Sequence, residues 1–309
     1  NGNITNFFQL KKELYEKSKK IINSNCDMEV VLNVFAEYLD RFKNKKITPE
    51  IIFSAVSYVY KKVKGSYAVV LYISGIGMVG FRDPFGLRPL LFGTKVADST
   101  DEKPIYGFAS ESTSLSVINF EKIRDVAPGS AIFISENKEL YEKKIAHKPH
   151  RPCIFEYIYF ARPDSDLNNI NVYSSRVELG NRLAKKIKAM KLEIDVVSPV
   201  PDSARTAAIA IARKLKLKYR EGLVKNRYIG RTFIMPEDSE RRESINQKLN
   251  PISSVFRDQN VLLVDDSIVR GNTSRAIVQM VRDSKAKKIF FASYSSPLTN
   301  PCLYGIDMQ

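Results

Sequence analysis

Hydrophobic and polar positions follow different patterns in the two halves of the chain. Before Gly65, apolar residues recur every three or four positions, which predicts amphipathic helices. The segments with this spacing are QLKKELYEKSKK (9–20), DMEVVLNVFAEYLDRF (27–42) and PEIIFSAVSYVYKKV (49–63). After Gly65, short runs rich in β-branched and aromatic residues, separated by Gly and Pro, predict strands. Those runs cover 66–73, 77–81, 106–110 and 131–135.

The second half alternates segments of helical spacing with short apolar runs. Helices are predicted over 177–190, over 202–215 and in the stretch that includes 277–283. Strands are predicted over 195–201, 218–224, 261–266 and 287–296. Such alternation is typical of a parallel sheet flanked by helices. The basic, proline-containing stretch KKIAHKPHRP is the predicted linker. We therefore expect an α/β protein with two domains, residues 1–150 and 151–309.

Length and composition indicate a globular protein. The chain has 309 residues, of which 44% are hydrophobic, enough for two domains that each bury a core. No apolar run approaches the length of a membrane span, and nothing at the start resembles a signal peptide. Three cysteines, Cys26, Cys153 and Cys302, are too few for a disulfide framework. We therefore expect a soluble, cytoplasmic protein with no membrane partner.

The net charge of +15 raises the question of nucleic-acid binding. The lysines alternate with acidic or apolar positions along predicted helices, and no nucleic-acid-binding module is recognisable. The charge therefore predicts a solvated surface and no nucleic-acid partner. It also favours a polyanionic small-molecule substrate, because a positive potential concentrates such molecules in clefts.

The segment VLLVDDSIVRGNTS (261–274) carries the strongest chemical signal. A buried apolar run ends in Asp265 and Asp266, and ligands of open α/β sheets bind beyond the carboxyl ends of such strands. Paired carboxylates suit sugar hydroxyls or Mg²⁺. The following loop offers hydroxyls and N–H groups at the start of a helix, where a phosphate is favoured. An ordinary turn with a solvated acidic pair is the alternative. The order of strand, acids and loop resembles the phosphoribosyl diphosphate (PRPP) binding motif of type I phosphoribosyltransferases.

A second strand end predicts further anion-binding groups. VVSPVPDSARTAA (196–208) is an apolar strand that runs into a turn, with Asp202 and Ser203 just before a helix. Plain N-capping of that helix by either side chain is the alternative interpretation.

A basic segment follows, KNRYIGRTFIMP (225–236), which includes Lys225 and Arg231. A mobile basic loop would neutralise the charge that builds on a departing pyrophosphate and would exclude water. A solvated charged loop is the alternative.

Several long motifs resemble one enzyme family. VPDSART, REGLVKNRYIGRTFI, QKLNP, VLLVDDSIVRGNTS and YGID, in this order, resemble the phosphoribosyltransferase half of the amidophosphoribosyltransferase (glutamine PRPP amidotransferase) family. NGN, a D-x-E pair, FRDPFGLRPLLFG, ASES and EYIYFARPDS resemble its glutaminase half. The resemblance covers nearly the whole chain. It implies a partial α+β class II (N-terminal nucleophile) glutaminase domain, followed by a type I phosphoribosyltransferase domain.

The resemblance implies roles for individual residues. Asn1 and Gly2 would form the oxyanion hole for glutamine hydrolysis, and Asp27 would receive the amino group of glutamine. Mg²⁺ would be positioned by Ser203, Asp265 and Asp266. The residues implied to bind PRPP are Asp202, Ser203, Lys225, Arg231, Asp265, Asp266, Ser267, Val269, Arg270, Gly271, Asn272, Thr273 and Ser274.

Two features depart from the family's pattern. The family's nucleophile is an amino-terminal cysteine activated by its own amine, whereas this chain begins with Asn1. The chain is therefore expected to be a fragment whose glutaminase half is inactive as given. Asn246 and Gln247 also stand where the family has an arginine-rich run, so weaker or different pyrophosphate contacts are expected there.

Two cysteines have a role implied by the resemblance. Cys153 and Cys302 match two ligands of the [4Fe–4S] cluster found in one branch of the family. Such clusters take four thiolates, and the other two lie beyond YGID in that branch. The resemblance implies a cluster in the intact protein, with two buried structural cysteines as the alternative. Cys26 is expected to be a packing residue.

The implied reaction is the first step of de novo purine biosynthesis. It forms 5-phosphoribosylamine, pyrophosphate and glutamate from PRPP and glutamine. Glutamine would be hydrolysed in the first domain, and the ammonia released would pass to the second domain and attack C1 of PRPP. The implied partners also include purine nucleotide feedback inhibitors and further copies of the chain, in a dimer or tetramer. A non-catalytic PRPP-binding regulator and a salvage phosphoribosyltransferase are the alternatives.

Overall fold

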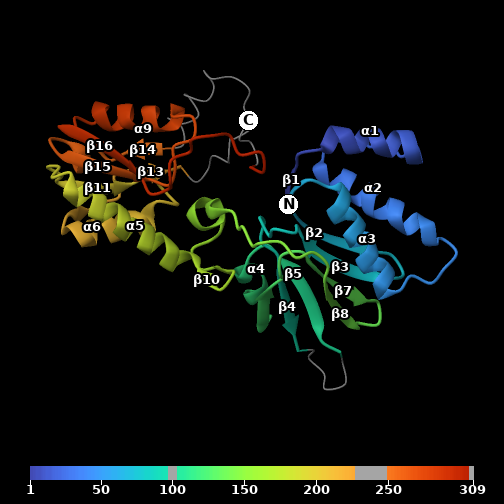
Figure 1. Cartoon of the computed structure of the whole chain (residues 1–309). Helices are drawn as coiled ribbons and strands as arrows, with labels where there is room; N and C mark the ends of the chain where they lie inside the picture. The colour runs from blue at the N-terminus through green and yellow to red at the C-terminus, as the bar shows by residue number, and fades with distance from the viewer. Residues whose placement is uncertain (97–102, 227–248, 306–309) are drawn as a thin grey trace. The chain divides into compact units, whose positions relative to one another are not determined.

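The chain forms two compact units (Figure 1). The computed structural model describes residues 1–96, 103–226 and 249–305. Unit 1 comprises Asn1–Glu156, Asp164–Ile170 and Asn300–Gln309. Unit 2 comprises Tyr157–Pro163 and Asn171–Thr299. The division therefore does not follow a single cut in the sequence, since segments from near both ends belong to unit 1.

Unit 1 contains a five-stranded antiparallel sheet in the order β1-β2-β3-β7-β8. Its strands are β1 (Gly2–Ile4), β2 (Gly65–Ile73), β3 (Gly77–Arg82), β7 (Ser130–Ser135) and β8 (Leu140–Lys144). Three helices cover one face of it, namely α1 (Phe7–Ser18), α2 (Asp27–Leu39) and α3 (Pro49–Lys62). Val30, Val56 and Phe81 are fully buried between these two layers. The helical spacing of the first 63 residues is thus explained by burial against this sheet.

A second sheet covers the opposite face of the first. It has three antiparallel strands in the order β5-β4-β6. They are β4 (Leu91–Lys95), β5 (Ile105–Ala109) and β6 (Lys122–Asp125). Ala68 and Ile132 of the first sheet pack with Phe92 and Val126 in one core. Smaller elements are η1 (Asp40–Phe42), α4 (Ser112–Ser116), the π-helical turn η2 (Glu156–Phe160), and the paired strands β9 (Asp166–Leu167) and β10 (Ile170–Asn171).

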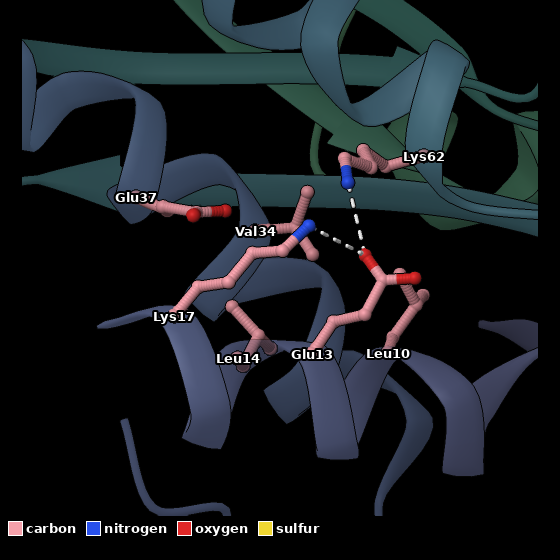
Figure 2. Close-up of a pocket in the computed structure, with 7 residues that line it drawn as sticks. All are labelled: Leu10, Glu13, Leu14, Lys17, Val34, Glu37 and Lys62. Atoms are coloured by element: carbon pink, nitrogen blue, oxygen red, sulfur yellow. Dashed lines mark hydrogen bonds and ion pairs between the residues drawn. The ribbon is translucent and has the colours of Figure 1, made fainter. Parts of the chain in front are cut away.

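Helix α1 is held by both apolar and charged contacts (Figure 2). Leu10 and Leu14 are buried in the same core as Val34 of α2. Beside them, Oε2 of Glu13 lies 2.9 Å from Nζ of Lys62 at the end of α3. Hydrogen bonding to Lys62 lowers the pKa of Glu13. The hollow that these residues line has a volume of about 10 Å³, which is room for no more than a water molecule.

Unit 2 is built on a four-stranded parallel sheet in the order β12-β11-β15-β16. Its strands are β11 (Val196–Pro199), β12 (Lys218–Tyr219), β15 (Asn260–Asp265) and β16 (Lys288–Ser293). Its longer helices are α5 (Val172–Ala189), α6 (Arg205–Leu215) and α9 (Asn272–Asp283). A separate antiparallel pair is formed by β13 (Leu223–Lys225) and β14 (Leu249–Pro251), followed by α8 (Ser253–Phe256).

Helices cover both faces of the parallel sheet. Leu262 packs in a core with residues of α5 and α6, whereas its neighbours Val261 and Leu263 pack in a second core with residues of α9. The uninterrupted apolar run of β15 is explained by this double burial. Helices α5 and α6 approach closely at Gly180, where an added Cβ would lie 2.7 Å from the carbonyl oxygen of Ala207.

The predicted fold class is confirmed, with differences at the level of elements. The strand predicted over 218–224 is two strands in different sheets, and between them the N–H of Gly222 donates to Oγ of Ser198. Strands β6 and β8 were not predicted, since their charged, mostly exposed sequences lack an apolar run. Among the described residues, no helix is long and apolar enough to cross a bilayer.

Candidate functional site

The two predicted acids lie at the carboxyl end of a central parallel strand. Asp265 is the last residue of β15 and Asp266 follows it, and each is 8% exposed. In the sheet register, Val264 lies beside Pro199 of β11, and Asp265 lies beside Ser293 of β16. The ends of three parallel strands therefore meet at one edge, which is where open α/β sheets bind ligands.

The protonation of Asp265 is strongly perturbed. Burial, and then the charge of Asp266, raise the pKa of Asp265 to about 7. The backbone N–H of Asp266 donates to Oδ1 of Asp265 at 2.8 Å and offsets part of this effect. A buried carboxylate in this state gains from a nearby cation, because the cation compensates the desolvated charge.

The donor set at this edge suits a hard cation. The carboxylates and adjacent hydroxyls are oxygen donors of the type that Mg²⁺ takes, and Mg²⁺ binds to proteins through few side chains and several waters. In the part of the chain that the structure describes, no group of three or more His, Cys, Asp or Glu side chains is placed to hold a metal. A cation here would therefore complete its coordination with ligand and water oxygens.

Hydroxyls from two loops converge on Asp266. Oγ of Ser203, from the turn after β11, donates to Oδ2 of Asp266. Oγ of Ser267 donates to the other carboxylate oxygen at 2.5 Å. The structure thus brings together the two strand ends that the sequence indicated separately. It also adds Tyr294, which sequence reasoning missed: its hydroxyl lies 2.7 Å from the carbonyl oxygen of Ile158 and 3.2 Å from that of Ser203.

The loop after the acids leads directly into α9. Gly271 precedes the helix with φ of 80°, a left-handed conformation that favours glycine, and no side chain caps the helix. Val269 is 53% exposed, and Oγ of Ser274 donates to the carbonyl oxygen of Gly271 at 3.0 Å. The amino end of a 12-residue helix therefore lies open just after the acids, with its dipole favouring an anion.

Asp202 is surrounded by cations. Its Oδ2 lies 3.2 Å from Nζ of Lys225, and its Oδ1 lies 3.1 Å from a guanidinium nitrogen of Arg205. Arg205 also pairs with Glu221 at 3.1 Å. Lys225, predicted to contact PRPP, thus lies near the Ser203 turn but is bound to a carboxylate. Arg231, Asn246 and Gln247 lie outside the described residues.

In unit 1, the NGN motif forms the start of β1. Gly2 lies opposite Tyr67 of β2, and a Cβ on Gly2 would lie 2.0 Å from the carbonyl oxygen of Ser66. Only glycine fits this position. The backbone N–H of Tyr67 donates to Oδ2 of Asp83, and the carbonyl of Tyr67 accepts from the N–H of Asp83, so neither group bonds Gly2. The N–H of Gly2 is therefore not used in the pairing with β2.

Asp27, the predicted glutamine-binding acid, lies against the same strand. At the start of α2, its Oδ2 accepts a hydrogen bond from the N–H of Ile4 at 2.6 Å. The structure therefore brings Asp27 to β1, the strand that contains Gly2 and Asn3 of the NGN motif.

The FRDPFGLRPL motif forms a loop around buried charges. Asp83 is fully buried and accepts hydrogen bonds from the N–H groups of Phe85 and Leu87, both at 2.9 Å. Burial raises its pKa. Further along, the buried Arg88 lies 3.0 Å from Oε1 of Glu156, which opens the EYIYF turn. Sequence reasoning missed this ion pair, and no signal in the sequence joins residues 68 positions apart.

The cysteines are all free thiols. Cys153 and Cys302 belong to the same unit although they are far apart in sequence. Burial is the main cause of the raised pKa of Cys153, and the nearby Cys302 adds to it. A [4Fe–4S] cluster takes four thiolates, so these two cysteines alone do not make up a ligand set. Cys26 is exposed, so its predicted role in packing is wrong.

Two family models match the chain. A glutamine amidotransferase domain matches residues 1–116, and a phosphoribosyl transferase domain matches residues 168–295. The chain therefore joins an N-terminal glutamine amidotransferase domain to a C-terminal phosphoribosyl transferase domain with a parallel sheet.

This chain is similar along its whole length to the amidophosphoribosyltransferase of several organisms. It is 50% identical over 311 residues to that of Pseudomonas aeruginosa, 48% over 311 residues to that of Escherichia coli K12, and 45% over 314 residues to that of Saccharomyces cerevisiae. All of this chain is aligned in each case, against 62%, 61% and 61% of the relative. The chain thus spans about three fifths of the length of the curated relatives it matches.

Two solved structures have the same fold. One is the allosteric regulatory enzyme of purine biosynthesis, and the other is glutamine PRPP amidotransferase from B. subtilis complexed with ADP and GMP. Each has a TM-score of 0.81 and 36% identity, covering 100% of this chain. The matched parts are 62% and 63% of those chains.

Proposed function

We propose that this chain is part of an amidophosphoribosyltransferase that forms 5-phosphoribosylamine from PRPP and glutamine. The observation that carries the proposal is the edge of the parallel sheet, where Asp265 and Asp266 meet the hydroxyl of Ser203 and the open end of α9. The similarity to amidophosphoribosyltransferases along the whole chain supports it. Functionally, residues 1–150 would serve glutamine hydrolysis and residues 151–309 would serve phosphoribosyl transfer.

The glutamine half would use groups on and beside β1. The amide of Asn1 and the N–H of Gly2 would stabilise the oxyanion that forms when the side-chain amide of glutamine is attacked. The N–H of Gly2 is available for this, since β2 does not use it. Asp27 would bind the α-amino group through Oδ1, because Oδ2 already accepts from Ile4. The nucleophile would be a cysteine that precedes Asn1 in the full-length protein.

The second half would transfer the phosphoribosyl group to ammonia. The nitrogen would attack C1 of PRPP, the bond from C1 to pyrophosphate would break, and the amine would lose a proton. The 5′-phosphate would bind the loop from Ser267 to Ser274, and the ribose hydroxyls would face Asp265 and Asp266. Lys225 and Arg231 would bind the pyrophosphate. No protein nucleophile is needed, so catalysis would rest on orientation, charge neutralisation and exclusion of water.

Two inorganic groups fit this proposal to different extents. Mg²⁺ would be held by Asp265, Asp266 and, through water, Ser203, and would neutralise charge on the pyrophosphate. A [4Fe–4S] cluster would be bound by Cys153 and Cys302 together with thiolates from beyond this chain. Cys153 and Cys302, which both belong to unit 1, support the second assignment only as half of a ligand set.

We further propose that the intact protein is regulated by purine nucleotides and is a cytoplasmic homo-oligomer, a dimer or tetramer. The B. subtilis relative was solved with ADP and GMP, which supports nucleotide binding.

The test is pyrophosphate release from PRPP by the full-length protein, with ammonia and then with glutamine as nitrogen donor. Both donors should support release, and Asp265→Ala should abolish it with either one. Retained activity in Asp265→Ala would refute the assignment of the site. Binding of PRPP without release would instead indicate a regulator, and release only with a purine base would indicate a salvage enzyme.

A further inference from the structure

A short segment near the end of the described chain is attached to the strand that carries the proposed oxyanion turn. Nδ2 of Asn3 donates a hydrogen bond to the carbonyl oxygen of Leu303 at 2.7 Å. Oγ of Ser66 donates to the next carbonyl, that of Tyr304, at 3.1 Å. We call Leu303–Tyr304 the strap. Since Asn3 and Ser66 are cross-strand partners in β1 and β2, two side chains at one sheet position bind two successive carbonyls.

A third group reaches the strap from a buried position. A guanidinium nitrogen of Arg88 lies 3.5 Å from the carbonyl oxygen of Tyr304, and Arg88 is fixed by its ion pair with Glu156 at 3.0 Å. Ser66 is 1% exposed. Ser66 and Arg88 are thus rigidly placed, although they contact the backbone of a residue 238 and 216 positions away in the sequence.

Polar contacts, rather than apolar burial, hold the strap. The side chains of Leu303 and Tyr304 leave these residues 72% and 44% exposed. The hydrophobic effect therefore contributes little here, since it scales with the apolar area removed from water. Hydrogen bonds to backbone carbonyls then determine where the strap lies, and reciprocally they restrain Asn3 and Ser66.

The strap adds to the restraints on strand β1. It has three residues and lies at the edge of the described sheet, paired with β2 alone. It is also attached by the bond from the N–H of Ile4 to Asp27, by the burial of Ile4 in the core, and by two backbone bonds between Asn1 and Ala68. A donor in an oxyanion hole must be placed within a few tenths of an ångström to be effective. Gly2 lies between Asn1, which is paired with Ala68, and Asn3, which is bonded to the strap, so the position of its N–H depends on both neighbours.

We propose that the strap fixes the Asn1–Gly2 turn in the geometry needed for glutamine hydrolysis, with Asn3 and Ser66 as the positioning residues. This inference rests on the proposed function and adds a regulatory point to it. Any event that displaces the strap would reduce the use of glutamine while leaving the use of ammonia intact.

The experiment compares two nitrogen donors in the full-length protein. Asn3→Ala and Ser66→Ala each remove one donor to the strap. Thr5→Ala is the matched control, since its hydroxyl bonds the carbonyl of Lys64 at 3.1 Å beside the same strand but does not touch the strap. Pyrophosphate release is measured with glutamine and with ammonia, and hydrogen exchange is followed over residues 300–305.

We expect each strap variant to lower kcat with glutamine by about tenfold, because a misplaced catalytic group costs one to two orders of magnitude. The KM for glutamine should change little, since Asp27 is untouched, and the ammonia-dependent rate should stay within about twofold of the wild type. Exchange over 300–305 should rise in both variants and not in Thr5→Ala. Asn3→Gln, which keeps an amide donor, should recover part of the glutamine rate.

Different failures have different meanings. If the wild type uses both donors but the strap variants lose both rates equally, or neither, the strap is structural and the inference is wrong. If exchange rises while the glutamine rate is unchanged, the strap is real but does not position the turn. A wild type without activity toward either donor would overturn the proposed function, and the inference with it.

Discussion

The two candidate sites are built in opposite ways. In unit 2, Asp265, Asp266 and Ser267 are consecutive, and the parallel pairing of β15 with its neighbours fixes where they lie. In unit 1, the turn at Gly2 depends on contacts with residues far away in the sequence, including one between positions 300 apart. A buried strand end positions its own side chains, whereas a short edge strand must be held by others.

The largest test of this contrast removes one charge from the local site. In the wild type, the carboxylate of Asp266 accepts hydrogen bonds from Ser203 and Ser267. Asp266→Asn keeps the shape of this side chain but removes its charge. We expect the ammonia-dependent rate to fall on the order of 1000-fold, because charge in a dry site contributes most to catalysis. Pyrophosphate release measures this. Asp283→Asn, at the exposed end of α9, is the control and should behave as the wild type. A similar loss in both would point to damage of the fold.

A second test disturbs the backbone of the site in unit 1. In Gly2→Ala, the new Cβ would lie 2.0 Å from the carbonyl oxygen of Ser66, so β1 must move. We expect about 100-fold loss of the glutamine-dependent rate with the ammonia-dependent rate retained. Gly75→Ala is the control, since Gly75 also has positive φ but open space around it. It should cost about 1 kcal/mol of stability in chemical denaturation and leave both rates unchanged.

The same contrast explains what the sequence could predict. The run VLLVDD indicated strand, burial and acids, because each property follows from consecutive residues, and β15 is where it was expected. The contacts of Asn3 with Leu303 and of Arg88 with Glu156 left no trace in the sequence. No periodicity links such positions, since only the folded chain brings them together. Tyr294 was missed for the same reason: it follows a strand without any local sign of its bond partners.

A third test uses pH to sharpen the account of the local site. Asp265 has a pKa raised from 3.8 to about 7, so it is mostly protonated below about pH 7 in the free protein. Binding of PRPP with Mg²⁺, as proposed above, would favour the ionised form. We therefore expect affinity to fall by about tenfold for each pH unit below 7, relative to Asp265→Asn. Titration calorimetry of PRPP binding to both proteins, from about pH 5.5 to about pH 8, measures this. Because PRPP itself also titrates in this range, the comparison with Asp265→Asn removes the contribution of the ligand.

The stability of the free protein should show the opposite dependence. The folded state holds the proton of Asp265 more tightly than the unfolded state, so this group's contribution to stability is lost as pH rises from 3.8 to about 7. Asp265→Asn should remove that part of the pH dependence in thermal melts. Identical profiles for both proteins would mean that Asp265 is not buried as described.

The smallest effect is expected at a long-range contact that holds no catalytic turn. Glu13 and Lys62 are 49 positions apart and joined at 2.9 Å, yet each side chain is about 30% exposed (Figure 2). Glu13→Gln should cost about 0.5 kcal/mol or less, because water and salt screen exposed pairs. Urea denaturation at low and high salt measures this, and the difference from the wild type should shrink at high salt. If Glu13→Gln also lowered the glutamine-dependent rate, then loss of any long-range contact in unit 1 would impair glutamine hydrolysis, and the contrast drawn here would be wrong. We expect that rate to be unchanged, because what distinguishes Asn3 from Glu13 is that it adjoins Gly2, whereas Glu13 restrains only the outer helix.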